Sequence, residues 1–296
     1  MMLKKDLLNV ADLSDQDLKK IILKAAFEKL PSKAYSNKLS AAALVFFENS
    51  SRTRMSFERA CQIVGRPYSI FDVEQSSISK GESLKETFEV LHDYGYRYFI
   101  VRIKEEGLLR QLQELEGSHV ISAGEGTVSH PTQVLGDAAA LLSYTKKKDI
   151  KALKGLRMAI VGDLLHSRVA KSWYDLAPRL GIKLTLVSPH NWRPDWGNDL
   201  PYFDSLRKAQ KDCDAIMALR VQRERHGASS GDREWQNYLT NFQLKKSDLT
   251  LKQVYLHPGP TNWGVELSEE LYAESKANLI SLQRKKCFHV RALLLS

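Results

Sequence analysis

The chain has 296 residues, of which 43% are hydrophobic, and a formal net charge of +9. This length suggests about two domains, each large enough to bury a core. The basic residues are spread along the chain without a long basic tail, which disfavours nucleic acid as a partner and favours small anions. No stretch has the length and apolarity of a signal peptide or a membrane span, so we expect a cytoplasmic protein without a membrane partner.

The first predicted helix follows Ser14, a candidate N-cap, and its apolar residues keep helical spacing up to Pro31. A short apolar run over residues 42–45 predicts a buried strand, and residues 55–64 predict an amphipathic helix that Gly65 ends.

The junction between this strand and helix gathers hydrogen-bond donors, namely Ser50, Ser51, Arg52 and Thr53. A helix N-terminus favours anions because its first N–H groups lack partners, and a guanidinium matches a phosphate. Taken alone, the run is equally compatible with a capping serine followed by a solvated arginine.

The rest of the chain alternates between predicted strands and helices. Strands are predicted at 68–73, 98–102, 120–123, 157–162, 183–188, 215–220 and 253–256. Helices are predicted at 84–91, 134–144, 169–180 and, for the most part, 273–295. This alternation predicts an α/β fold with two doubly wound parallel-sheet domains. Because open sheets bind ligands at the ends of their strands, we expect the active site in the cleft between the two domains. We expect domains at 1–134 and 135–274, with a C-terminal helix of about 275–296 packing back on the first.

Polar residues follow six of these predicted strands, where open α/β sheets place ligands. The sets are Ser50–Thr53, Arg102 and His130 with Gln133 in the first domain, and Asp163–Arg168, Arg220–Gln222 and His257–Pro260 in the second. Each has an ordinary alternative: a surface salt bridge for Arg102, a cap for His130, a helix start for Arg168. Together they predict a site for a small substrate with several negative charges.

Several of these segments resemble the signatures of the aspartate and ornithine carbamoyltransferases. The loop Phe46-Phe47-Glu48 with Ser50-Ser51-Arg52-Thr53-Arg54 resembles their carbamoyl-phosphate loop, and His130-Pro131-Thr132-Gln133, with Asp137 beyond it, matches their second signature. The aspartate branch of the family is favoured by Glu48, by Lys80-Gly81-Glu82-Ser83, by His257-Pro258-Gly259-Pro260 without a cysteine, and by Arg220-Val221-Gln222-Arg223-Glu224-Arg225.

The resemblance implies a carbamoyl-phosphate site in the first domain. Its implied binding residues are Ser50, Ser51, Arg52, Thr53, Ser76, Lys80, Arg102, His130 and Gln133. Ser76 and Lys80 would come from a neighbouring subunit of a homotrimer. The implied catalytic residues are Arg52, Thr53, Lys80, Arg102 and His130, with Thr53, Arg102 and His130 facing the developing oxyanion.

The resemblance also implies an L-aspartate site in the second domain. Its implied residues are Lys80, Arg168, Arg220, Gln222, Pro258, Gly259 and Pro260. The implied reaction gives N-carbamoyl-L-aspartate and phosphate in pyrimidine biosynthesis. It needs no cofactor or metal, and regulatory chains or a dihydroorotase are further partners that the resemblance allows.

Three alternatives remain open at this point. One is transfer to another amino acid such as ornithine, which the missing cysteine and Lys80 disfavour. A nucleotide-binding dehydrogenase is suggested by Ile160-Val161-Gly162-Asp163 but lacks the glycine-rich fingerprint. The third is a non-catalytic descendant of the family. Trp263 stands where many bacterial relatives have an arginine, so the affinity for aspartate is expected to differ.

Overall fold

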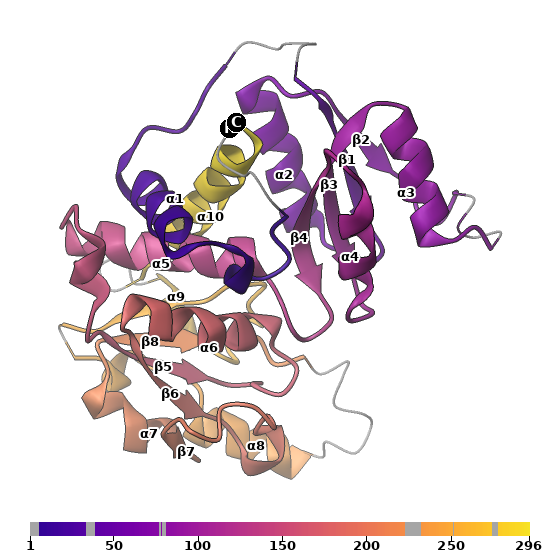
Figure 1. Ribbon diagram of the computed structural model, residues 1–296. Coiled ribbons are helices and arrows are strands. Elements are labelled where there is room, and N and C mark those ends of the chain that lie inside the picture. Colours follow the sequence, from indigo (N-terminus) through magenta and orange to yellow (C-terminus); the bar gives the residue numbers. More distant parts are fainter. Residues whose placement is uncertain are drawn as a thin grey trace. The chain divides into compact units, whose positions relative to one another are not determined.

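The computed structural model describes residues 6–33, 39–76, 78, 81–222, 232–250, 252–273 and 278–296. The chain divides into two compact units, one of Met1–Ala139 with Lys285–Ser296 and one of Ala140–Arg284. Each unit is built on a parallel sheet with helices between its strands (Figure 1). The doubly wound α/β class predicted from the alternating pattern is therefore confirmed. None of the described helices has the length and apolarity needed to cross a membrane.

The sheet of the first unit has four parallel strands in the order β2-β1-β3-β4. They are β1 (Ala41–Phe46), β2 (Tyr68–Phe71), β3 (Tyr96–Ile103) and β4 (His119–Glu125). The chain runs from β1 to β2 on one side and then returns to β3 and β4 on the other. The strand order therefore reverses between β1 and β3, where Phe46 pairs with Arg102. Such a switch point is where open α/β sheets bind ligands.

Helices cover both sides of this sheet, with α2 on one side and α3 and α4 on the other (Figure 1). The helices that begin in this unit are α1 (Asp15–Phe27), α2 (Ser51–Val64), α3 (Leu84–Asp93), α4 (Leu108–Gln111) and α5 (Pro131–Thr145). The Ser14 hydroxyl accepts the Asp17 N–H at 3.1 Å, which confirms the predicted N-cap. Gly65 ends α2 in the left-handed conformation, also as predicted.

The second unit has a five-stranded parallel sheet in the order β7-β6-β5-β8-β9. Its strands are β5 (Arg157–Val161), β6 (Lys183–Val187), β7 (Tyr202–Phe203), β8 (Ala215–Ala218) and β9 (Val254–Leu256). Its helices are α6 (Arg168–Leu180), α7 (Leu206–Ala209), α8 (Asp232–Asn241) and α9 (Glu269–Ala273), and α10 (Ile280–Leu295) begins in it. The strand order reverses between β5 and β8, which makes a second switch point.

The predicted C-terminal helix is wrong at residues 278 and 279, which lie outside any helix, while residues 274–277 of the prediction lie outside the described residues. Asn278 forms a parallel β-bridge with Tyr255, and its side chain accepts the Ile280 N–H at 2.8 Å. An extended residue next to a strand cannot be helical, so α10 begins only at Ile280. From Lys285 onward, α10 belongs to the first unit, where Lys286 Nζ donates to the Ala26 carbonyl oxygen at 2.7 Å.

Candidate functional site

The N-terminus of α2 lies next to the switch point of the first sheet. Ser50 occupies the N-cap position without a side-chain capping hydrogen bond, and its carbonyl oxygen accepts the Arg54 N–H at 3.0 Å. Ser51 and Arg52 are exposed on the first turn, whereas Thr53 is buried. The simpler interpretation, an N-cap serine followed by a solvated arginine, holds for the N-cap position of Ser50 and the exposure of Arg52, but the Ser50 hydroxyl makes no capping bond. Because no serine side chain caps it, the positive end of the helix dipole remains directed toward an incoming anion.

Arg102 stands at the end of β3 and is paired with a carboxylate. Its Nε lies 3.1 Å from Oε2 of Glu48, which follows β1, and the two side chains are 17% and 16% exposed. Its Nη1 donates to the Ala123 carbonyl oxygen at 3.2 Å. The salt bridge considered as the ordinary alternative exists, but it is mostly buried. A guanidinium has its five N–H donors in a fixed plane, so these two contacts orient the whole Arg102 side chain.

His130 and Gln133 lie at the start of α5, beyond the end of β4. His130 is 7% exposed, and its carbonyl oxygen accepts the Gln133 N–H at 3.1 Å. The Gln133 Nε2 donates to Oδ1 of the fully buried Asp137 at 2.7 Å. Because an ionised carboxylate only accepts, this bond fixes the amide and leaves Oε1 of Gln133 as the acceptor. The orientation of the Gln133 amide is thus fixed by the protein itself.

Three of the predicted groups of the first unit gather at one edge of its sheet, because β1, β3 and β4 are neighbours. Ser76 lies in the loop after the edge strand β2, and its hydroxyl donates to the Val73 carbonyl oxygen at 2.7 Å. Lys80 lies outside the described residues.

In the second unit, Asp163 connects the ends of β5 and β8. Its buried carboxylate accepts the His166 Nδ1–H at 2.9 Å through Oδ1 and the backbone N–H of Gln222 at 3.1 Å through Oδ2. The Gln222 Nε2 donates to the His166 carbonyl oxygen at 2.7 Å. These bonds hold the segments after β5 and β8 together at the switch point.

Gly162 allows this close approach of the two strand ends. Its φ is +121°, a conformation that L side chains rarely adopt, and an added Cβ would lie 3.0 Å from the Leu219 carbonyl oxygen. Only glycine fits this position without strain.

Arg168 and Arg220 bring two cations to these neighbouring strand ends. Arg168 is the first residue of α6 and is 8% exposed, while the Ser167 hydroxyl caps the helix by accepting the Ala170 N–H at 3.2 Å. A cation at a helix N-terminus opposes the helix dipole. Arg220 is half-buried two residues after the end of β8. The segments after β5 and β8 thus carry two guanidinium groups, and Gln222 connects these segments through its hydrogen bond to the His166 carbonyl oxygen.

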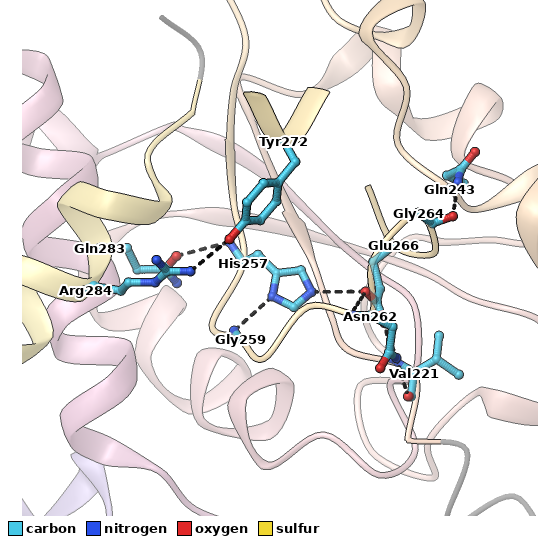
Figure 2. A network of polar contacts seen from close by, with 10 residues as sticks. All are labelled: Val221, Gln243, His257, Gly259, Asn262, Gly264, Glu266, Tyr272, Gln283 and Arg284. Atoms are coloured by element: carbon cyan, nitrogen blue, oxygen red, sulfur yellow. Dashed lines mark hydrogen bonds and ion pairs between the residues drawn. The ribbon is translucent and has the colours of Figure 1, made fainter. Parts of the chain in front are cut away.

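The segment His257–Pro260 follows β9, the neighbour of β8 (Figure 2). The buried His257 donates its backbone N–H to Oε1 of Gln283 at 3.0 Å, and its Nδ1 accepts the Gly259 N–H at 2.9 Å. Pro258 and Gly259 are half-buried, and Pro260 is exposed. Strand order therefore brings together all three predicted groups of the second unit.

Sequence analysis missed two residues behind these groups, Asn262 and Glu266. His166 lies within the predicted set Asp163–Arg168, and Asp137 was noted only as part of the second family signature. Glu266 is a buried carboxylate between two apolar residues, Val265 and Leu267, and this pattern is the one signal that would have identified it. Trp263, predicted to lie near the site, is 63% exposed, and its ring meets that of Tyr272 edge-on at 4.8 Å.

The described residues include no group of three or more histidine, cysteine or acidic side chains arranged to hold a metal. Burial raises the pKa of Cys61 to about 12 and that of Cys213 to about 11. Both thiols are therefore protonated near neutral pH and are poor nucleophiles.

Two doubly wound units, each with cations and donors at its switch point, define a protein of the α/β class that binds small anions. A family model described as the carbamoyl-P binding domain of aspartate/ornithine carbamoyltransferase matches residues 5–143, and one described as the Asp/Orn binding domain matches residues 154–296. The chain belongs to the aspartate/ornithine carbamoyltransferase family.

Relatives and solved structures agree with this assignment. The chain is 33% identical to the aspartate carbamoyltransferase catalytic subunit of Legionella pneumophila (strain Corby), covering 98% of both chains. It resembles aspartate transcarbamoylase from Trypanosoma cruzi in complex with carbamoyl phosphate, with a TM-score of 0.84 at 23% identity, covering 100% of this chain and 96% of that one. It also resembles ornithine carbamoyltransferase from Thermus thermophilus, with a TM-score of 0.82 at 23% identity, covering 99% of this chain and 98% of that one. The fold alone thus does not separate the two acceptor amino acids.

Proposed function

We propose that this chain transfers the carbamoyl group of carbamoyl phosphate to L-aspartate, giving N-carbamoyl-L-aspartate and phosphate. The observation that carries the proposal is the position of Arg168, Arg220 and Gln222 at the ends of the neighbouring strands β5 and β8. Two cations and an amide suit the two carboxylates of aspartate. The relatives at 33–34% identity that cover most of the chain are named as aspartate enzymes, which supports the same acceptor.

In this proposal the first unit binds carbamoyl phosphate. Ser50, Ser51, Arg52 and Thr53 hold the phosphate at the α2 N-terminus, with Ser76 and Lys80 supplied by a neighbouring subunit. Arg102, Thr53 and His130 donate to the carbonyl oxygen, and Gln133 accepts from the carbamoyl amide. The hydrogen bond from Gln133 to Asp137 supports the last role, because it leaves Oε1 as the acceptor.

The second unit then binds L-aspartate. Arg168 pairs with the α-carboxylate, and Arg220, Gln222 and Lys80 bind the β-carboxylate. Because one N–H of the Gln222 amide already donates to His166, its second N–H is the one that faces the ligand. Backbone carbonyls in the Pro258–Pro260 segment orient the amine. Ornithine would place a cation beside Arg220, losing a charge-assisted hydrogen bond worth roughly 1.5–3 kcal/mol and adding repulsion.

The chemistry follows from these positions. The neutral amine of aspartate attacks the carbonyl carbon, a C–N bond forms and the carbonyl oxygen becomes an oxyanion. The carbonyl is restored as the C–O bond to phosphate breaks, and the proton lost by the amine nitrogen passes to the departing phosphate. Donors directed at the oxyanion supply most of the catalysis, at about 2.7–4 kcal/mol each.

The proposal also covers the setting of the reaction. We infer a cytoplasmic homotrimer in pyrimidine biosynthesis, with active sites shared between neighbouring chains. Regulatory chains or a dihydroorotase are partners to be sought by co-purification.

Carbamoyl transfer by the purified chain tests the proposal, with L-aspartate or L-ornithine as the acceptor. We expect product with aspartate only. Arg52→Ala should lower kcat/KM at least about 100-fold, because a bidentate contact to phosphate contains two charge-assisted hydrogen bonds. Arg59→Ala is the matched control, since Arg59 lies on the same helix and bonds the nearby Gln62 at 3.2 Å. Product with ornithine alone would overturn the acceptor, and no product with either would favour a non-catalytic protein.

A further inference from the structure

The carboxylate of Glu266 is buried at the centre of a polar network in the second unit (Figure 2). Its Oε1 accepts the backbone N–H of Val221 at 2.9 Å and Nδ2 of Asn262 at 2.7 Å. Its Oε2 accepts the backbone N–H of Asn262 at 2.8 Å, and Nε2 of His257 lies 3.7 Å from this oxygen. The carboxylate has no solvent exposure, so its charge is balanced by these donors.

The network joins the two segments that our proposal assigns to aspartate. Val221 lies between Arg220 and Gln222, and its carbonyl oxygen accepts Nδ2 of Asn262 at 3.0 Å. Both polar backbone groups of Val221 are therefore held by Asn262 and Glu266. Asn262 lies two residues after Pro260, so the same two side chains tie the chain just beyond the Pro258–Pro260 segment to the residues that follow β8.

His257 extends the network into the other side of the aspartate site. Its Nδ1 accepts the Gly259 N–H, so the proton of a neutral His257 ring is on Nε2, the nitrogen that faces Glu266. A glutamate is better suited here than a glutamine. The groups that surround the Glu266 carboxylate are hydrogen-bond donors. A glutamine at this position would direct the N–H donors of its amide at one of them.

We propose that Glu266 is a positioning residue for the second substrate. Through Val221, Asn262 and His257 it fixes the Arg220–Gln222 segment and the Pro258–Gly259 backbone relative to each other, without itself contacting the ligand. This inference rests on the proposed function, because it concerns the assigned aspartate site.

The test is the kinetics of Glu266→Gln, which keeps the size of the side chain and removes its charge and one acceptor oxygen. We expect the KM for aspartate to rise roughly 10- to 100-fold, since misplaced binding groups weaken substrate binding steeply. The KM for carbamoyl phosphate should stay within about twofold, and kcat at saturating aspartate should fall much less than kcat/KM.

Gln253→Glu is the matched control. Gln253 is a buried amide just before β9, at the opposite end of that strand from His257. Its Nε2 donates to the carbonyl oxygens of Cys213, at 2.8 Å, and of Gln210. Glu266→Gln replaces a carboxylate oxygen by an amide nitrogen, and Gln253→Glu makes the opposite replacement at a second buried position. Gln253→Glu should therefore lower the melting temperature and leave the aspartate KM unchanged.

Asn262→Ala keeps the inference testable even if Glu266→Gln does not fold. It removes the bonds to Val221 and Glu266 from a half-buried position, and it should raise the aspartate KM in the same selective way. The double variant should be less impaired than the product of the single effects, because both changes break the same bond.

The outcomes separate the two proposals. A wild-type chain without carbamoyl transfer to aspartate overturns the proposed function and this role with it. An active wild type, together with Glu266→Gln and Asn262→Ala variants whose aspartate KM stays within about twofold, overturns only the positioning role. If Glu266→Gln is less stable but has the same aspartate KM as Gln253→Glu, Glu266 contributes to the stability of the fold and not to positioning the substrate.

Discussion

At the scale of single residues, the proposed ligand-binding groups are oriented by protein acceptors before any ligand binds. Arg102 is held by Glu48 and Ala123, Gln133 by Asp137, and Gln222 by His166. Each of these bonds restricts the orientation of the side chain that donates it. A group fixed in this way loses little rotamer freedom on binding, so more of its interaction energy contributes to affinity and catalysis.

His130 gives the first prediction at this scale. If its imidazole donates to the developing oxyanion, His130→Ala removes one donor and should lower kcat by roughly 10²- to 10³-fold, corresponding to about 2.7–4 kcal/mol. Steady-state rates at saturation with both substrates measure this. The control is His119→Ala, because His119 begins β4 and packs against Tyr98, with 4.9 Å between the ring centroids. An unchanged kcat in His130→Ala would exclude His130 from the oxyanion site.

At the scale of elements, hydrophobic patterning predicted the strands whose ends carry the candidate site residues. These strands are buried on both faces, so each of them is a continuous apolar run in the sequence. β1, β5 and β8 are such strands, and each was predicted within a few residues. The predicted strand 215–220 ran two residues too far. The Leu219 N–H still donates to the Val161 carbonyl oxygen, but Leu219 and Arg220 lie outside the strand. The two-residue β7 was missed because so short an edge strand has no periodicity.

Sequence analysis predicted the site residues at the strand ends but not the residues that hold them in place. Residues at strand ends carry a sequence signal, since a polar side chain interrupts an apolar run. Asn262 and Glu266 carry almost none, because their partners lie about 40 residues earlier in the sequence, at Val221. Contacts over such separations depend on which strands are neighbours, and patterning does not specify strand order.

The contact between α5 and α10 gives the prediction at the element scale. A Cβ added at Gly136 in α5 would lie 2.6 Å from the backbone nitrogen of Cys287 in α10. Backbone atoms cannot move aside as a side-chain end can, so Gly136→Ala should destabilise the protein by about 1–3 kcal/mol. Urea unfolding measures it. Helix propensity alone would stabilise Gly136→Ala by up to about 1 kcal/mol. A lower free energy of unfolding would therefore support the close contact with Cys287, and a higher one would contradict it.

At the scale of the whole molecule, the net charge of +9 suits a protein whose two substrates are anions. The proposed trimer adds a requirement that no single chain meets, because Lys80 is assigned to the neighbour of the chain that binds the phosphate. In a cyclic trimer each contact is directional, so every interface contributes one site built from two chains.

Subunit mixing tests this arrangement. Arg52→Ala and Lys80→Ala chains should each be inactive alone. After dissociation and random reassembly in equal amounts, three quarters of the trimers are hybrids, and each hybrid has one intact site of three, so about a quarter of the wild-type activity should return. Mixing Arg52→Ala with Arg168→Ala is the control, since both residues are assigned to the same chain's share of the site and no hybrid regains an intact one. Activity that stays absent in the first mixture, while hybrids form, would place Lys80 in the same chain's site as Arg52.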